Sequence, residues 1–443
     1  MASSPWKPSS RHANAVRFAD ALAELESRQP EHMPEPSLDR IRAIAELLDH
    51  PQLTYPTVHV TGTNGKTTTA RLVSAVACAH GLSTGLFTSP HLRSVTERFE
   101  LCGEVMSQAE FAEEYEHLLP YLQVVDASAG EVTYFEALTA LAYLWFADKP
   151  VALGVFEVGM GGTWDATNLV GGDVAVICPV GLDHPELGST IVEVATEKAG
   201  IIKPGRIAVV REQPPEALAV IETRCAEYEV RMLLEDRDFA LETRVPAVGG
   251  QALRVRGIHG AYDDLLLPLY GEHSGRNAAA AIVALEAFLE RGLDGPSLRR
   301  AIEEATSPGR LEVVARHPLI VLDGAHNPAA AEALARALPE AFTWDRLHLV
   351  MAVFSNKDVA GIAERLAPRV DRAYAATTDS VRARPAEEVA LALAAEGVAA
   401  QRFESVRAAL DAARADAAPE DLILVTGSLY TVGDARRALL EEP

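Results

Sequence analysis

The residues with the clearest chemical signature follow a β-branched run, Thr57 to Thr61. The segment that comes next reads Gly62, Thr63, Asn64, Gly65, Lys66, Thr67 and Thr68, and an apolar helix-like stretch follows it. Glycines there let backbone N–H groups close on phosphate oxygens, while the lysine neutralises their charge and a threonine hydroxyl can reach Mg²⁺. The eight-residue Walker spacing is not met. We predict a nucleotide phosphate-binding loop, and the alternative is a plain strand-to-helix turn.

Another polar group follows the apolar run that ends at Glu157. Glycines at 159, 161 and 162 keep the backbone after it open. A carboxylate at the C-terminal end of a parallel strand stands where α/β sheets bind ligands. Taken alone, the neighbouring Asp165, Asn168 and Asp173 are equally explained as caps and turns.

The next apolar run ends before Asp183 and His184, an oxygen and an imidazole that Mg²⁺ can use only if other oxygens complete its shell. On the residues alone, His184 is a satisfied polar side chain. Thr190 and Glu193 form a capping-box pattern, which predicts a helix that carries Glu197 and Lys198 and stops at Gly200. The helix dipole alone explains a lysine at that end.

Several loops of the C-terminal part also place polar residues beside the ends of expected strands. Asn327 and Pro328 have the N-cap and first-turn pattern of a helix. Because the loops recur at equivalent places, we predict a shared site rather than separate turns; its candidates are Arg310, Asp323, His326, Asn327, residues 356–358 and residues 427–430.

Apolar strands that alternate with helices must position these residues. The first series of expected strands lies near residues 55–60, 83–89, 151–159, 173–181 and 206–212, and predicts a parallel sheet covered on both faces. Residues 243–271 read as an antiparallel appendage, with helices near 277–292 and 298–305. A second series lies near 319–326, 346–354, 372–378 and 421–428. We therefore predict an α/β protein of two domains: residues 1–306 with the phosphate loop in a mainly parallel sheet, a linker at 307–312, and a smaller Rossmann-like α/β domain at 313–443.

Composition narrows the class of protein further. The chain has 443 residues and a net charge of −23, which argues against a nucleic-acid partner. Its longest apolar stretch, Ala137 to Ala147, is shorter than the about 18 residues that cross a bilayer, so we predict a core helix and no membrane partner. Cys78, Cys102, Cys178 and Cys225 are too widely spaced for a CxxC pair. We expect four reduced, buried thiols in a cytoplasmic protein.

Taken in order, the motifs resemble the folylpolyglutamate synthase/dihydrofolate synthase family, a branch of the Mur-ligase superfamily of ATP-dependent amide ligases. They are TGTNGKTT, TSPHL with ERF, TYFE, EVGMGG-x-x-DATN, GLDH, LG-x-T, EKAGIIKPG, PGRLE, LDGAHNP, KD and VTGSLY. They cover nearly the whole chain. The resemblance implies a Mur-ligase central domain followed by the smaller closing domain.

The resemblance also implies roles for individual residues. ATP would be bound by the phosphate loop together with Asn277, Arg310, Asp323 and His326. Two Mg²⁺ ions would be held by Ser89, Glu157, His184, Thr67 or Thr68, and Lys198 in a carbamylated form. The folate side would involve Ser89, Pro90, His91 and Arg98, and the amino-acid side His326, Ser428 and Tyr430.

These roles imply that the substrate carboxylate attacks the γ-phosphorus of ATP and that the glutamate amine then displaces phosphate. The acceptor would be dihydropteroate, folylpolyglutamates or both, and the protein a monomer. Two alternatives remain: a Mur-type ligase acting on another carboxylate, disfavoured by the short stretch before the phosphate loop, and a P-loop phosphotransferase or regulator without ligase activity.

Three positions depart from the family pattern. The phosphate loop continues with Thr67 and Thr68, where many members have glycine and then serine or threonine. Thr163, followed by Trp164, replaces an arginine and removes a cation near the metal site. The usual G-x-H-Q segment ends in Ser274, so a glutamine contact near the adenine is missing.

Overall fold

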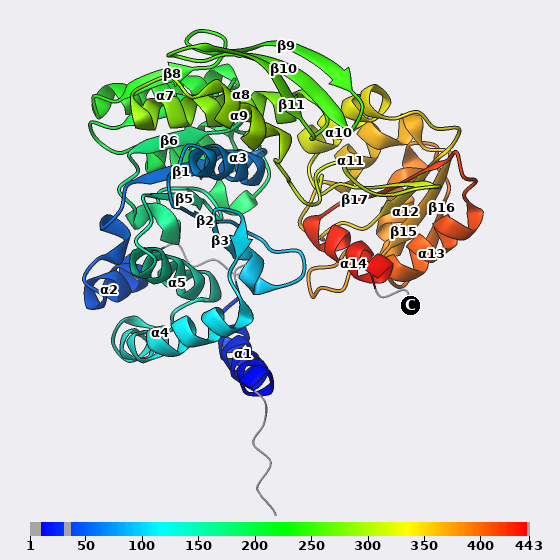
Figure 1. The fold of residues 1–443 in the computed structure, drawn as a ribbon. Helices are drawn as coiled ribbons and strands as arrows, with labels where there is room; N and C mark the ends of the chain where they lie inside the picture. The colour runs from blue at the N-terminus through cyan, green and yellow to red at the C-terminus, as the bar shows by residue number, and fades with distance from the viewer. Residues whose placement is uncertain (1–9, 31–36, 441–443) are drawn as a thin grey trace, which may run out of the picture.

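The computed structural model describes residues 10–30 and 37–440, so parts of the predicted domains at 1–9, 31–36 and 441–443 lie outside the described residues. Two α/β halves lie side by side in Figure 1, each built on its own sheet. Chain order divides them cleanly, since the strands of one half precede those of the other. The predicted two-part α/β fold is confirmed.

The first half contains an eight-stranded sheet in the order β4-β3-β2-β5-β1-β6-β7-β8. Its strands pair in parallel except β3 and β4, which form an antiparallel edge. Its strands are β1 (Thr57–Thr61), β2 (Thr84–Phe87), β3 (Phe99–Leu101), β4 (Glu104–Val105), β5 (Leu153–Glu157), β6 (Val174–Ile177), β7 (Ile207–Val210) and β8 (Arg231–Leu234). The central strands are buried on both faces, which explains their continuous apolar sequence.

Helices cover both faces of this sheet. One face packs on α3 (Lys66–Ala79), α8 (Glu272–Leu289) and α9 (Gly295–Glu303). The opposite face packs on α1 (Ser10–Ser27), α2 (Asp39–Leu47), α4 (Gln108–Ala129) and α5 (Tyr134–Asp148) over one part, and on α6 (Ile191–Lys198) and α7 (Pro215–Glu227) over the other. α5 contains the predicted core helix. None of the described helices is long and apolar enough to cross a bilayer.

The predicted antiparallel appendage is a three-stranded sheet in the order β11-β10-β9. Its strands are β9 (Ala240–Ala247), β10 (Gly250–Arg256) and β11 (Ala261–Leu267). Apolar residues of β10 and β11 join the core formed by α3, α8 and α9.

The second half holds a six-stranded sheet in the order β12-β13-β17-β14-β15-β16. Only β12 is antiparallel. The strands are β12 (Glu312–Arg316), β13 (Leu319–Leu322), β14 (Leu347–Met351), β15 (Arg372–Ala376), β16 (Ala400–Phe403) and β17 (Leu422–Thr426), covered by α10 (Pro328–Ala341), α11 (Val359–Leu366) and α12 (Ala386–Ala395) on one face and by α13 (Val406–Asp416) and α14 (Leu429–Leu440) on the other. As expected, Asn327 caps α10.

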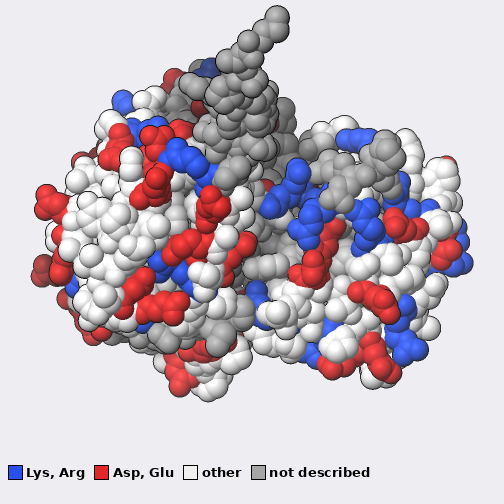
Figure 2. All heavy atoms as spheres, turned by 90° about the horizontal axis from the view of Figure 1, so that it is seen from below, with Lys and Arg blue, Asp and Glu red and all other residues white. Residues whose placement is uncertain are grey.

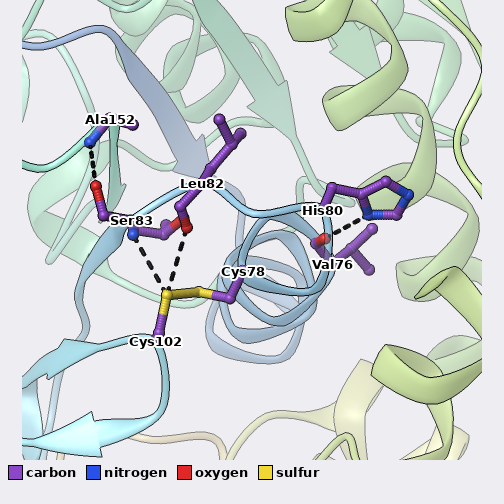
Figure 3. Close-up of a disulfide and its surroundings, with 8 residues drawn as sticks. Val76, Cys78, His80, Leu82, Ser83, Cys102 and Ala152 are labelled. Atoms are coloured by element: carbon purple, nitrogen blue, oxygen red, sulfur yellow. Dashed lines mark hydrogen bonds between the residues drawn. A yellow bond between two sulfur atoms is a disulfide. The ribbon is translucent and has the colours of Figure 1, made fainter.

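The expectation of four reduced thiols is wrong. Cys78, in the last turn of α3, is bonded to Cys102, in the turn between β3 and β4, and their Cα atoms lie 5.5 Å apart (Figure 3). β2 lies between these segments in sequence, and β3 pairs with it, which brings the two cysteines together. Cys102 is also exposed rather than buried. Cys178 and Cys225 are free and buried, as expected.

Candidate active site

The phosphate loop has the strand–loop–helix geometry that the sequence predicts. β1 runs directly into it, and α3 begins at Lys66. Gly62 and Gly65 have φ values of 146° and 91°, which side chains rarely adopt. A Cβ on Gly62 would lie 2.5 Å from the Cβ of Cys178, and one on Gly65 would lie 2.8 Å from Oδ1 of Asn277. Both positions therefore require glycine.

Two other loop residues fix this segment to its surroundings. The Thr63 hydroxyl donates to the carbonyl of Gly181, while the Thr63 amide donates to the carbonyl of Pro179. Asn64 exchanges amide hydrogen bonds with Asn327 of the second half, at 3.3 and 3.1 Å. The loop thus contacts both halves of the molecule.

Two lysines converge on one backbone carbonyl of the loop. Nζ of Lys66 and Nζ of Lys198 lie 3.1 and 2.9 Å from the oxygen of Gly62. Burial, together with the charge of Lys66, lowers the pKa of Lys198 to about 7. A neutral amine is therefore well populated at neutral pH, which is the form that can act as a nucleophile.

Glu157 lies at the end of β5 beside the phosphate loop. Its carboxylate accepts hydrogen bonds from the Thr67 hydroxyl at 2.7 Å and from the Ser89 amide at 3.1 Å. Burial raises the pKa of Glu157, and Lys66 opposes that rise. The Thr68 hydroxyl instead contacts Ser307, so Thr67 is the threonine that faces Glu157.

Asp183 joins the two halves at the cleft. Its carboxylate accepts a hydrogen bond from Nζ of Lys357 at 2.7 Å and lies 3.3 Å from Nε2 of His326. Burial alone would raise the pKa of Asp183, but these contacts outweigh it and hold the pKa below its ordinary value. Burial, assisted by Lys357, lowers the pKa of His184 to about 3, so this ring keeps a free lone pair at neutral pH.

Asp323 organises the facing loop of the second half. Its two carboxylate oxygens each accept a backbone hydrogen bond, from Leu311 and from Ala325, both at 2.8 Å. Burial raises the pKa of Asp323, while Arg310 opposes the rise. This arrangement turns the Arg310 loop and the His326 loop toward the same cavity.

A cavity of about 370 Å³ lies between the halves and collects most of the predicted residues. Those that line it are Thr63, Asn64, Gly65, Lys66, Thr67, Thr68, Ser89, Pro90, Glu157, His184, Asn277, Arg310, Asp323, His326, Ser428 and Tyr430. Residues that follow β1, β5 and β6 thus meet residues that follow β13 and β17. The cavity also has an apolar side formed by Phe135, Met160 and Trp164.

The predicted residues that do not line this cavity are Gly62, His91, Arg98, Lys198, Asn327, Asp358 and Gly427. Arg98 is buried, and its Nε donates to Nδ1 of His91 at 3.0 Å. The guanidinium also lies 5.6 Å from the ring centre of Tyr134. In this structure His91 and Arg98 therefore contact each other outside the cavity lining.

The amino-acid-side residues occupy the start of α14. The Ser428 hydroxyl accepts a hydrogen bond from the Thr431 amide at 3.0 Å, as a helix cap does. The Tyr430 ring lies 5.1 Å from that of Phe354. The Arg382 guanidinium stands over both rings, at 4.2 Å from Phe354 and 5.4 Å from Tyr430.

Three further cations line the cavity: Arg211 and Arg382, which were not predicted, and Lys357, which lies in the predicted segment 356–358. Lys357 had a usable signal, because residues 356–358 follow an apolar strand. Arg211 follows β7 directly, but its neighbours in sequence match no binding motif. The position of Arg211 in the cavity depends on the packing of β7 beside α8, which the sequence does not reveal.

Thr163 stands where the family pattern has an arginine, and hydrogen bonds fix it against α6. Its hydroxyl donates to the carbonyl of Glu197 at 3.1 Å, and its amide donates to the same oxygen at 3.0 Å. A Cβ on Gly200 would lie 2.1 Å from Oγ1 of Thr163. Glycine at position 200 therefore permits close packing against Thr163. Gly200 lies within a 3-10 turn, residues 199–201, and is not the C-cap that we expected. The predicted capping box of Thr190 and Glu193 is confirmed.

The neighbouring polar residues are explained by structure. Asp165 caps a 3-10 turn through the Thr167 amide. Asp173 accepts a hydrogen bond from the Thr57 amide at 2.8 Å, and Asn168 accepts one from Nζ of Lys203 at 2.7 Å. The caps-and-turns interpretation therefore describes Asp165, while Asn168 and Asp173 connect separate segments by hydrogen bonds.

We tested whether the predicted metal ligands fit a cation. Within the described ranges, no three side chains among His, Cys, Asp and Glu gather into a metal site. Oxygen ligands do gather, because the Thr67 hydroxyl contacts the buried carboxylate of Glu157. Carboxylate and hydroxyl oxygens are the ligands that Mg²⁺ prefers. This donor set fits one Mg²⁺ ion.

Comparison with known proteins agrees with this geometry. The Mur ligase middle domain matches residues 60–285, and the Mur ligase glutamate ligase domain matches residues 309–429. A dihydrofolate synthase/folylpolyglutamate synthase of Mycobacterium tuberculosis is 40% identical, over 95% of this chain and 93% of that protein. The chain belongs to this family. The Bacillus subtilis member is 33% identical, over 91% of this chain and 95% of its own.

Solved structures of the dihydrofolate synthase/folylpolyglutamate synthase family share the whole fold. A Mycobacterium tuberculosis folylpolyglutamate synthase complexed with ADP superposes with a TM-score of 0.93 at 38% identity, covering 97% of this chain and 99% of that one. The Escherichia coli protein in complex with DHPP and ADP gives 0.86 at 31% identity, covering 95% and 97%.

Proposed function

We propose that this protein is an ATP-dependent ligase that adds L-glutamate to dihydropteroate, to folylpolyglutamates, or to both, and releases ADP and phosphate. The observation that carries the proposal is the cavity between the halves. It brings a phosphate loop and the Glu157 carboxylate together with residues from the glutamate ligase domain. The same fold in family members with bound ADP supports it.

We infer the following positions for the substrates. The phosphate loop, Gly62 to Thr68, would hold the ATP phosphates, with Asn277, Arg310 and Asp323 on the nucleoside side. Ser89 and Pro90 would contact the folate, with His91 and Arg98 holding their loop. His326, Ser428 and Tyr430 would contact the incoming glutamate. The apolar side of the cavity suits a flat aromatic ring such as a pterin.

We further propose two Mg²⁺ ions. Glu157, Thr67 and Ser89 would hold the first, while His184 and a carbamylated Lys198 would hold the second. Bound there, Mg²⁺ would supply positive charge to phosphoryl oxygens. The neutral His184 ring and the low pKa of Lys198 support the second site, because a metal-binding imidazole must be unprotonated and CO₂ adds only to a neutral amine.

The chain's own residues would act on charge and on water. The folate carboxylate attacks the γ-phosphorus to give an acyl phosphate and ADP, and the glutamate amine then displaces phosphate. Both steps build negative charge on oxygens, and Lys66 stabilises it from the start of α3. The second half, joined through Asp183 and Asn64, excludes water that would hydrolyse the acyl phosphate.

We also propose the domain division that the sequence indicated, residues 1–306 and 313–443 with a linker at 307–312. Its support is that β8 and α9 precede this linker, while β12 begins at the linker's last residue, Glu312. A monomer in the cytoplasm remains our proposal. The cysteines no longer support that compartment, since two of them are bonded.

The decisive assay combines purified protein with ATP, Mg²⁺ and glutamate. ADP release should depend on dihydropteroate or a reduced folate, and mass spectrometry should find the glutamylated product. ADP release that needs another carboxylate would support a different Mur-type ligase. Release that needs no acceptor would support a phosphotransferase or regulator, and either result would overturn the proposal.

A further inference from the structure

Arg211 is a buried cation at the nucleotide side of the cavity. It directly follows β7, is only 3% exposed, and lines the cavity beside Asn277. A buried arginine needs a partner for its charge, because removal from water is costly. Glu235, after β8, supplies it: Nε of Arg211 donates to Oε2 of Glu235 at 2.8 Å.

This ion pair is held rigidly. The side chain of Glu235 is fully buried, and its Oε2 also accepts the Glu212 amide at 2.8 Å. One end of the Arg211 guanidinium is thereby fixed by the sheet. The other end, Nη1, donates to Oδ1 of Asn277 on α8.

The chemistry of the guanidinium then determines how the Asn277 amide is turned. Arginine carries only N–H donors, so the atom of Asn277 that faces it must be the oxygen. Nδ2 must point the other way. Among residues in the described ranges Nδ2 has no hydrogen-bond acceptor, and Asn277 lines the cavity.

The same amide lies against the phosphate loop. A Cβ built on Gly65 would lie 2.8 Å from Oδ1 and 3.3 Å from Nδ2 of Asn277. A nucleotide whose phosphates rest on this loop would therefore pass directly over the Asn277 amide. Two N–H donors without an acceptor at that place suit a ring nitrogen or an oxygen of the nucleotide.

We propose that Arg211 is a positioning residue for the nucleotide: held by Glu235, it fixes the Asn277 amide so that both Nδ2 hydrogens face the bound ATP. This inference rests on the proposed function only for the identity of the ligand. In this role Arg211 acts through Asn277.

The test measures binding of a non-hydrolysable ATP analogue with Mg²⁺ by calorimetry, without folate or glutamate. Arg211→Met should weaken binding about tenfold, as expected for losing one hydrogen bond to a charged group. In turnover assays the KM for ATP should rise by a similar factor, with kcat and the KM for glutamate within about threefold. Arg254→Met, which removes an exposed arginine paired with Glu242 and Asp263, is the matched control and should bind normally.

A double-variant cycle separates positioning from other roles. Asn277→Ala should weaken binding at least as much as Arg211→Met, and the combined variant should bind no more weakly than Asn277→Ala alone. If the two single-variant losses of affinity multiply in the combined variant, the proposal is overturned. Normal binding in Arg211→Met would also overturn it.

Arg211→Met leaves the buried carboxylate of Glu235 without its cation, so a second variant is needed in case the single variant does not fold. Arg211→Met combined with Glu235→Met removes both charges and should show the same tenfold loss. Normal binding by this folded double variant would also overturn the proposal. If the wild-type protein binds the analogue but shows no folate-dependent ADP release, the proposed function fails. The role of Arg211 is then still decided by the binding affinities of the variants.

Discussion

At the scale of single residues, Lys198 is the side chain whose chemistry depends most on its surroundings. It ends α6, is 3% exposed, and shares the Gly62 carbonyl with Lys66. An ordinary lysine with a pKa near 10.4 is almost wholly charged at neutral pH. The pKa of about 7 makes the neutral, CO₂-reactive form abundant.

We therefore predict that carbamylation of Lys198 increases with pH. Below the pKa of about 7 the protonated amine cannot add CO₂, whereas above it the neutral amine can, so at fixed dissolved CO₂ the adduct should grow from pH 6 to pH 8. NMR with ¹³CO₂ would measure it. The signal should vanish in Lys198→Ala and persist in Lys149→Ala, an exposed lysine paired with Glu110.

Turnover gives the second readout for Lys198. Lys198→Ala should lower kcat by about 100-fold or more, as expected when a group that stabilises charge in the reaction is removed. Binding of an ATP analogue should survive, because the phosphate loop keeps Lys66. Unchanged turnover in Lys198→Ala would contradict a role at the metal site.

At the scale of elements, the structure differs from the sequence prediction mainly at sheet edges. The central strands were predictable because burial on both faces demands continuous apolar residues. The edge strands β4, β8, β12 and β16 were not predicted; β4 and β16 are largely exposed and carry polar residues, so no such pattern marks them. The sequence also could not reveal the disulfide between Cys78 and Cys102, because their contact depends on how β3 pairs near the edge of the sheet.

The disulfide should stabilise the β3–β4 edge against unfolding. It closes a loop between cysteines 24 residues apart, which corresponds to about 3 kcal/mol of free energy of unfolding in the chain-entropy estimate. The denaturant midpoint should fall when a dithiol reductant is added. Cys102→Ser should show a low midpoint that the reductant no longer changes.

Counting thiols checks the disulfide directly. The denatured, unreduced protein should expose two reactive thiols, Cys178 and Cys225, and full reduction should expose four. Four thiols before reduction would contradict the bonded pair.

At the scale of the whole molecule, the net charge of −23 has to coexist with anionic substrates. Figure 2 shows acidic side chains spread over the visible faces of both lobes, interspersed with basic ones. The cavity is different, since Lys66, Arg211, Arg310, Lys357 and Arg382 all line it. The motifs predicted the phosphate loop, which follows an apolar strand, and the facing Arg310 loop, which lies between α9 and β12. The cross-half contacts were not predictable, since they depend on how two separately folded sheets are placed.

The contact between Lys357 and Asp183 should hold the two halves closed. Both side chains are nearly buried, at 7% and 5% exposure, so salt screens this pair little. Lys357→Met would leave a buried carboxylate with only the imidazoles of His326 and His184 beside it, which should disfavour the closed arrangement by about 3 kcal/mol. Small-angle X-ray scattering should then give a larger radius of gyration than for the wild type, at low and high salt alike. Arg372→Met, which breaks a surface pair with Asp416 inside the second half, should leave the scattering unchanged. An unchanged radius in Lys357→Met would show that the remaining cross-half contacts, among them Asn64 with Asn327 and Arg244 with Glu340, are sufficient to keep the cleft closed.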